Sequence, residues 1–419
     1  MSETRDLVPY VASDWRVPVR FRIFLQRAGT RVSSHRHMNP RSVIAGLVGA
    51  AAAVTIAMPA NAARFIAYVG TYTGPKSDGI YAFRFDTDTG VAEPVGLVAK
   101  TANPTFLAVH PDGKHLYAAN EVDQWNGKPG GYVTAYRVDA GTGKLEEINQ
   151  QSTVGGGPCH LNVDATGRVL IAANYGGGSV VSFPIAPDGS LRPHASFVQH
   201  TGSSVDPARQ KEPHAHSANL SPDNRFVFVA DLGLDKVMVY ALDAARATLT
   251  PHTAPFARLA PGSGPRHLAW APDGRSAYVN GEMLSTVTRF SYEAHGSLLN
   301  EGATASTLPP GFSGNSSTAE VRVHPNGRFV YVSNRGHDSI AILRTDSKGT
   351  LTLVENVSTQ GKVPRNFNLD PSGRWLWAAN QDSGSVFIYS VDGASGHLKP
   401  TGQRLDVGSP VCVRFVAVR

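Results

Sequence analysis

A short turn recurs along most of the chain, and each copy is followed by the same order of apolar and polar positions. Pro fixes φ in this turn, Asp or Asn bonds to its own backbone, and Gly accepts a positive φ. The spacing of about 51 residues indicates an internal structural repeat. Five clear copies and one degenerate copy occur: His110-Pro111-Asp112-Gly113, Asp164-Ala165-Thr166-Gly167, Ser221-Pro222-Asp223-Asn224, Ala271-Pro272-Asp273-Gly274, His324-Pro325-Asn326-Gly327 and Asp370-Pro371-Ser372-Gly373.

Each turn is followed by a β-rich run, a Gly/Ser/Asp-rich turn, a further run such as SVVSFPI or SVFIYSV, and a weaker fourth run. The runs directly after the recurring turn end in a small polar residue: Asn120, Asn174, Asp231, Asn280, Asn334 and Asn380. Together with the run before the turn, this makes four strands per repeat. Four antiparallel strands per unit are typical of a propeller blade, so the pattern predicts an all-β fold, a β-propeller.

The six turns mark six blades, and the two ends of the chain supply a seventh. Residues 65–72 and 79–85 resemble the second and third strands of a repeat, and residues 409–415 resemble a first strand with nothing after it. We expect the C-terminal strand to complete the N-terminal blade, which closes the ring and removes exposed sheet edges. The length of residues 63–419 divided by the repeat gives seven. We therefore predict a seven-bladed β-propeller, since six or eight blades do not fit the turns.

Polar residues gather at one end of the predicted first strands. The body of each strand carries apolar residues at alternate positions, but its start carries pairs such as Arg266-His267. Second strands run antiparallel to the first, so their ends, with Glu282 and Arg335, lie at the same rim. First strands line the axis of a propeller, and we expect one polar mouth of its central channel. The expected members are His160, His214, His216, Arg266, His267, Glu282, Glu320, Arg322, Arg335 and Arg365.

Two interpretations of this mouth stay open. A ring of structural salt bridges would explain paired charges on inner strands, since charges are rarely buried without pairing or function. An anion-binding site is favoured, because the expected mouth holds four Arg against two Glu and guanidinium groups suit carboxylates and phosphates.

The net charge at first suggests a nucleic-acid partner, but its location excludes one. The chain carries +6, and residues 1–62 account for +5 of it with eight Arg against three acidic residues. The remaining +1 leaves no basic stripe that could track phosphates. With 41% apolar and 17% charged residues, the composition is that of a folded globular protein. We expect no nucleic-acid partner and a monomer.

Residues 1–62 are predicted to be an N-terminal extension and a signal peptide. The apolar residues 42–58 follow a short basic start at Met38 and precede Ala60-Asn61-Ala62, a small-x-small sequence that signal peptidase recognises. The run is short and rich in Ala and Gly, which favours a cleaved signal over a retained anchor. Whether residues 1–37 are translated stays open. Cleavage near Ala62 would place the domain in the periplasm or outside the cell, off the membrane; an unused signal would leave it in the cytoplasm.

His214-Ala215-His216 places two imidazoles on one face of a strand. The pattern suits metal binding, substrate hydrogen bonding or catalysis, or a structural role. We expect no metal, because no third ligand is adjacent in sequence. We also expect no cofactor, because the Gly-rich segments lie in β turns rather than before a helix. Cys159 and Cys412 fall in different blades, so we expect a core thiol at Cys159 and no disulfide.

Four segments of the repeats resemble a known family, in order along the chain. They are PHAHSANLSPDNRFVFVADLGLDKV, GPRHLAWAPDGRSAYV, AEVRVHPNGRFVYVSNRGHDSIA and VPRNFNLDPSGRWLWAANQDSGSV. They resemble the lactonase family of seven-bladed propellers, which includes propeller-type 6-phosphogluconolactonases and is similar to the fungal carboxymuconate lactonizing enzymes. The resemblance spans residues 64–419. It implies a metal-free catalytic His, Arg and Glu, which match His216 (or His214), Arg266 and Glu282, although Gly281 departs from the Asn that the family tends to hold.

The residues and the resemblance together predict an enzyme that hydrolyses a sugar-acid lactone, in the manner of a 6-phosphogluconolactonase. Its partner would be a small, anionic lactone. Opening a lactone requires an activated water and a stabilised oxyanion. We assign Glu282 or His216 as general base and Arg266 to the oxyanion. The expected substrate-binding residues are His160, His214, His267, Glu320, Arg322, Arg335 and Arg365. A lactone-forming cycloisomerase of the carboxymuconate type and a non-catalytic binding propeller are the alternatives.

Overall fold

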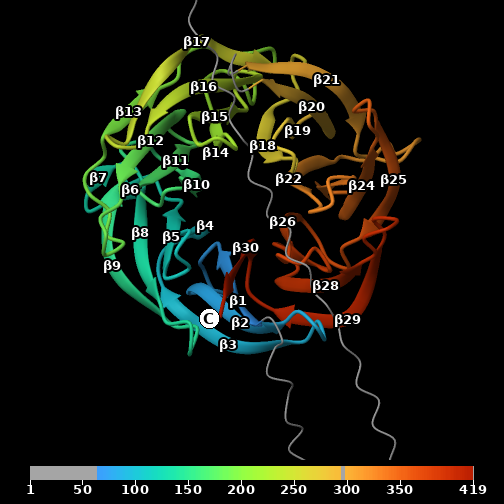
Figure 1. The fold of residues 1–419 in the computed structure, drawn as a ribbon, viewed down its shortest axis with the longest axis horizontal. Helices are drawn as coiled ribbons and strands as arrows, with labels where there is room; N and C mark the ends of the chain where they lie inside the picture. Colours follow the sequence, from blue (N-terminus) through green and yellow to red (C-terminus); the bar gives the residue numbers. More distant parts are fainter. Residues whose placement is uncertain (1–63, 294–297, 419) are drawn as a thin grey trace, which may run out of the picture. The chain divides into compact units, whose positions relative to one another are not determined.

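The protein is a seven-bladed β-propeller (Figure 1). The computed structural model describes residues 64–293 and 298–418, and every regular element within these ranges is a β-strand. No helix in them is long and apolar enough to cross a membrane. The predicted extension and signal peptide, residues 1–62, lie outside the described residues.

Seven four-stranded antiparallel sheets form the blades, numbered here from the N-terminus. Blade 1 contains β1 (Arg64–Thr71), β2 (Gly79–Asp86), β3 (Ala92–Lys100) and β30 (Pro410–Ala417). Blade 2 contains β4 (Pro104–Val109), β5 (His115–Asn120), β8 (Tyr132–Val138) and β9 (Leu145–Ser152), with a hairpin of β6 (Gln124–Trp125) and β7 (Lys128–Pro129). Blade 3 contains β10 (Pro158–Val163), β11 (Val169–Asn174), β12 (Ser179–Pro184) and β13 (Ser196–Gln199).

The other four blades follow the same order. Blade 4 contains β14 (Ala215–Leu220), β15 (Phe226–Asp231), β16 (Lys236–Asp243) and β17 (Thr248–Arg258). Blade 5 contains β18 (Pro265–Trp270), β19 (Ser276–Gly281), β20 (Thr286–Glu293) and β21 (Leu298–Ser306). Blade 6 contains β22 (Ser317–Val323), β23 (Phe329–Arg335), β24 (Ser339–Thr345) and β25 (Leu351–Ser358). Blade 7 contains β26 (Pro364–Leu369), β27 (Trp375–Asn380), β28 (Ser385–Val391) and β29 (Leu398–Asp406).

The last strand closes the ring, as predicted. β30 is the inner strand of blade 1 and pairs with β1 over almost its whole length. Each inner strand contacts the inner strand of the next blade all the way round, from β4 to β30 and back to β4 (Figure 1). Between blades 1 and 7, Trp377 packs edge-to-face on Phe85 at 5.1 Å between ring centroids and on Phe415 at 5.5 Å. Apolar packing therefore joins the two ends of the chain.

The recurring turns also connect neighbouring blades. His110 Nε2 lies 2.8 Å from the carbonyl oxygen of Gly167, in the turn of the next blade, and His324 Nε2 lies 3.0 Å from that of Gly373. Both glycines have a positive φ, 71° and 72°, which explains why Gly recurs at this turn position. The repeat in the sequence thus encodes contacts between blades as well as the turn inside each blade.

Candidate active site at the mouth of the channel

A β-bulge at the start of the inner strand presents the polar residues of the mouth. Pairing with the second strand shifts register here in every blade, for example between Pro158 and His160 in β10 and between Pro265 and Leu268 in β18. A bulge leaves a residue unpaired and re-aims its side chain. The residues passed over by the pairing are Thr105, Cys159, His216, Arg266, His267, Ala319, Glu320, Arg365 and Val411.

Glu282 is the central carboxylate on one side of the mouth. It directly follows β19 and is 5% exposed. Its Oε2 lies 3.1 Å from Arg266 Nε and 3.1 Å from Arg335 Nη2, and its Oε1 accepts a hydrogen bond from Arg209 Nη2 at 2.9 Å. Three guanidinium groups therefore surround one carboxylate.

These neighbours keep Glu282 ionised. Burial alone would raise the pKa of its carboxyl, but the charges of Arg335 and Arg266, together with the hydrogen bond from Arg209, hold that pKa well below its usual range. Because these three guanidinium groups already contact both of its oxygens, the carboxylate has little capacity left to take a proton from a water molecule. Its chemical role is to neutralise and orient the arginines.

Arg266 is the most deeply buried of these cations. Burial, together with Arg335 and Arg365, lowers the pKa of Arg266 to about 10, so it stays charged at neutral pH. Its Nη1 donates to His267 Nε2 at 3.0 Å, and His267 Nδ1 lies 3.1 Å from Glu320 Oε1. Because Arg266 only donates, His267 must accept at Nε2 and carry its proton on Nδ1. A continuous polar chain thus runs from Glu282 into the channel.

A second polar group faces Arg266 across the mouth. Arg365 Nη2 donates to the Tyr72 hydroxyl at 3.1 Å, and that hydroxyl donates to Glu121 Oε1 at 2.8 Å. The other oxygen of Glu121 accepts from Thr105 Oγ1 at 2.6 Å. Four arginines at this end of the channel, Arg209, Arg266, Arg335 and Arg365, therefore face two carboxylates, Glu121 and Glu282. The excess of positive charge suits an anion.

His216 is held neutral between these two groups. Burial first, then Arg266 and His267, lowers the pKa of its imidazole well below the usual value. Its Nδ1 lies 3.6 Å from Cys159 Sγ, and its ring contacts Tyr175 edge-on. Burial also raises the pKa of the Cys159 thiol far above its ordinary value, so this cysteine is a thiol at neutral pH, not a nucleophile. Cys159 and Cys412 are both free and buried, as expected.

A hollow of about 10 Å³ lies among these side chains. Cys159, His216, Arg266 and Arg365 line it, together with Glu121. This volume is close to the space that one water molecule needs. His214 does not line the hollow; it stacks on Tyr175 at 4.6 Å between ring centroids, with its Nδ1 3.0 Å from the Tyr175 carbonyl oxygen.

The structure divides the ten residues expected at the mouth between different depths of the channel. His214, His216, Arg266, Glu282, Arg335 and Arg365 lie at the mouth. His160, His267 and Glu320 lie one level deeper, where the His160 ring contacts the Phe106 ring in a tilted arrangement, 4.1 Å between centroids. Arg322 lines a separate cavity towards the opposite end of the channel. Alternation along the strand explains this, because Arg322 lies two residues beyond Glu320 on β22.

Arg209 was not singled out by the sequence, although it contacts Glu282. It comes from the long segment between β13 and β14, and nothing in the blade repeat aligns with it. Its Nη2 also donates to the Tyr175 hydroxyl at 3.1 Å. Glu121 and Tyr72 occupy repeat positions equivalent to Glu282, which is the signal that could have placed them in the site.

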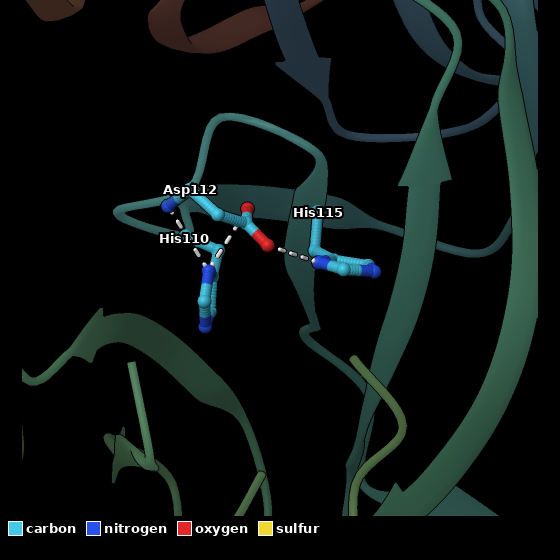
Figure 2. Close-up of side chains that lie close together, drawn as sticks. All are labelled: His110, Asp112 and His115. Carbon is cyan, nitrogen blue, oxygen red and sulfur yellow. Dashed lines mark hydrogen bonds and ion pairs between the residues drawn. The ribbon is translucent and has the colours of Figure 1, made fainter. Parts of the chain in front are cut away.

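One cluster with the spacing of metal ligands occurs within residues 64–293 and 298–418, and it lies outside the mouth. Asp112 lies between His110 and His115 in the turn after β4 (Figure 2). Its Oδ2 is 2.9 Å from His115 Nδ1, and its backbone N–H donates to His110 Nδ1 at 3.2 Å. His110 Nε2 also bonds to Gly167 in the next blade. These contacts give the cluster a structural role, which is to fix the turn against the neighbouring blade.

The chain belongs to the lactonase family of seven-bladed β-propellers, whose family model matches residues 66–415. A 6-phosphogluconolactonase of Bacillus subtilis is 38% identical over 355 residues, 84% of this chain and 99% of that protein. A 6-phosphogluconolactonase of Formosa agariphila is 33% identical over 81% of this chain and 96% of its own length. Among solved structures, the periplasmic gluconolactonase PpgL of Pseudomonas aeruginosa is 38% identical, with a TM-score of 0.80 over 85% of this chain and all of that one.

Proposed function

We propose that the protein hydrolyses the lactone of a sugar acid at the mouth of its channel. Membership of the lactonase family and the names of its relatives support the reaction class. The observation that carries the proposal is the clamp of Arg209, Arg266 and Arg335 on Glu282 beside a neutral His216. This arrangement fixes positive charge next to a group that accepts a proton, which is what lactone opening requires.

His216 is the general base in this proposal. Its Nδ1 faces Cys159, which leaves Nε2 for a water molecule in the hollow. The water oxygen forms a bond to the lactone carbonyl carbon while its proton passes to Nε2. The carbonyl oxygen becomes an oxyanion, which Arg266 and Arg365 stabilise. When the ring C–O bond breaks, the imidazolium returns its proton to the leaving oxygen, so that the products are a hydroxy acid and the unchanged enzyme.

Glu282 acts as a positioning residue. It fixes the guanidinium planes of Arg266 and Arg335 without taking the proton itself. The sequence left Glu282 and His216 open as general base, and this proposal keeps only His216. The remaining N–H groups of Arg209 and Arg335 would bind hydroxyl groups of a sugar lactone, the phosphate of a phosphorylated one, or the carboxylate of the product.

We further propose that the protein acts after export. The segment 42–62 has the features of a cleavable signal, and a periplasmic gluconolactonase is among its structural relatives. Such a location would favour an unphosphorylated sugar lactone over 6-phosphogluconolactone, whose pathway is cytosolic. N-terminal sequencing of exported protein tests this: a mature end near Ala63 supports it, and an end that retains residues 42–58 contradicts it.

A panel of lactones tests the proposed reaction. The purified protein is assayed on glucono-1,5-lactone, 6-phosphogluconolactone and an aliphatic lactone, with spontaneous hydrolysis subtracted. We expect acceleration of both sugar lactones and none of the aliphatic one. Rates equal to those in buffer for every sugar lactone, with a folded protein, would contradict the proposal.

A further inference from the structure

A second cavity lies at the other end of the channel from the mouth. It has a volume of about 480 Å³, within the range of about 300–1,000 Å³ that is usual for small-molecule sites. The C-terminal halves of the inner strands line it. Its charged side chains are Arg322, Arg414 and Glu320. The catalytic proposal uses none of them.

The two arginines of this cavity are incompletely paired. Arg322 Nη2 donates a long hydrogen bond of 3.4 Å to Glu320 Oε2, and its buried Nε has no hydrogen-bond partner among the described residues. Arg414 lies over the Phe106 ring at 4.4 Å from its centroid, and its Nη1 donates to the carbonyl oxygen of Val413. No carboxylate partner is found for Arg414 in the part of the chain that the structure describes.

Glu320 has little capacity left to neutralise them. Its carboxylate already takes contacts from His267 Nδ1, Asn366 Nδ2 and the backbone N–H of Val321. The two imidazoles in the cavity wall add no negative charge. Burial, followed by neighbouring His267 and Arg414, keeps His160 neutral by lowering its pKa. Two guanidinium groups therefore face one heavily shared carboxylate, and the cavity is left with a positive charge.

The rest of the lining adds groups that suit a hydroxylated ligand. Three amides, Asn162, Asn219 and Asn368, come from β10, β14 and β26. Trp270 also lines the cavity, and its buried indole Nε1 lacks a hydrogen-bond partner among the described residues. Amides both donate to and accept from hydroxyl groups, whereas an indole only donates. Charge and hydrogen bonding thus point to the same kind of small molecule.

We propose that this cavity is a second binding site, which takes a small hydroxylated carboxylate. Arg322 and Arg414 bind the carboxylate, the asparagine amides bind hydroxyl groups, and the Trp270 side chain forms part of the wall. The site is separate from the mouth, and it does not depend on the protein being a hydrolase. It touches the mouth through Phe106 and His267, which line both spaces, and His267 bonds to Arg266 on one side and Glu320 on the other.

Calorimetric titration with D-gluconate tests the site directly. Glucitol, which has the hydroxyl groups but no carboxylate, serves as the ligand control. The protein variants are Arg322→Gln in the second cavity and Arg365→Gln at the mouth, each checked for cooperative unfolding. We expect a gluconate-binding component with a Kd of about 1 mM or tighter. Arg322→Gln weakens this component at least tenfold, whereas Arg365→Gln leaves it unchanged, and glucitol does not compete.

The variants separate this site from the catalytic proposal. If Arg322→Gln fails to fold, Asn162→Leu takes its place, since Asn162 lines the cavity without charge. A gluconate component that Arg322→Gln removes and Arg365→Gln spares supports the site even if no lactone is hydrolysed. The proposal is overturned if gluconate does not bind, or if its binding is unaffected by the cavity variant.

Discussion

Arg266 Nε lies 3.1 Å from Glu282 Oε2, and both side chains are almost wholly buried, at 3% and 7% exposure. Desolvation makes such a pair costly, and it is retained where the charges are held by further partners. Arg335 and Arg209 are those partners here. The pair is therefore best understood as the fixed centre of a charged site, and removing one member leaves buried charge uncompensated.

Replacing Glu282 with Gln is expected to lower both stability and activity. Three arginines lose their countercharge, and breaking a buried pair costs about 3 kcal/mol or more of unfolding free energy. We expect kcat/KM to fall at least tenfold. Denaturant unfolding and lactone assays measure the two effects. Glu146→Gln is the matched control, because Glu146 pairs with Arg137 on the surface and should change stability by less than about 1 kcal/mol. Equal effects of the two variants would contradict this role of Glu282.

Replacing His216 with Asn is expected to lower kcat by about a hundredfold or more, with KM little changed, because the general base is lost. His214→Asn is the control. His214 stacks on Tyr175 and bonds to a backbone carbonyl, so its loss should raise KM more than it lowers kcat. Steady-state kinetics on a sugar lactone separate the two. If His214→Asn shows the larger loss of kcat, the base is assigned to the wrong histidine.

Stability is expected to decrease as the pH falls below about 6.5. His160, His216 and His267 are buried, and the pKa of each is lowered in the folded protein. Between that lowered pKa and the ordinary value of 6.5, the unfolded chain binds more protons, so unfolding becomes easier as pH falls. Each group contributes up to about 1.4 kcal/mol per pH unit. Above pH 6.5 these histidines contribute no further change.

Denaturant unfolding at pH 5.5 and 7.5 measures this dependence. The His216→Asn variant should show a smaller difference between the two pH values than the wild type, because one buried imidazole is absent. A wild-type stability that does not change from pH 5 to 7 would contradict the neutral state of these histidines.

Deleting residues 410–419 is expected to abolish cooperative unfolding or to cause aggregation. The deletion removes β30, which exposes the edge of β1 and takes Phe415 from its contact with Trp377. Removing residues 1–62 should leave the melting temperature of the propeller unchanged, because β1 begins at Arg64. Calorimetric melting compares the two truncations. A C-terminal deletion that melts like the parent would show that ring closure does not depend on β30.

The sequence predicted the propeller because its signals are local and repeated. Each recurring turn and each β-rich run carries its own sequence signal, so seven blades and their closure follow from counting. The site was predicted less completely. Regular alternation would place Arg266 and His267 on opposite faces of the strand. The bulge in β18 instead brings both side chains towards the channel. Such a bulge has no residue type that predicts it from the sequence.

The position of each side chain along the channel axis was the other feature that the sequence did not predict. The sequence grouped Arg322 with the mouth, whereas the direction of β22 carries it to the second cavity. Arg209 was missed because it lies in a segment outside the repeat and reaches Glu282 only through the tertiary fold. The positions of Arg322 and Arg209 depend on how distant segments pack together, which neither the periodicity nor the spacing of the sequence encodes.

The rate of glucono-1,5-lactone opening by the wild-type protein and by Arg365→Gln shows whether the arginines at the mouth stabilise the oxyanion of lactone hydrolysis. Arg365 lines the hollow beside His216, and Gln keeps its hydrogen-bonding capacity towards Tyr72 while removing the charge. We expect the wild type to accelerate opening at least a hundredfold over buffer, and the variant, with an unchanged melting temperature, to be at least tenfold slower than the wild type. A wild type no faster than buffer, or a variant as fast as the wild type, would contradict it.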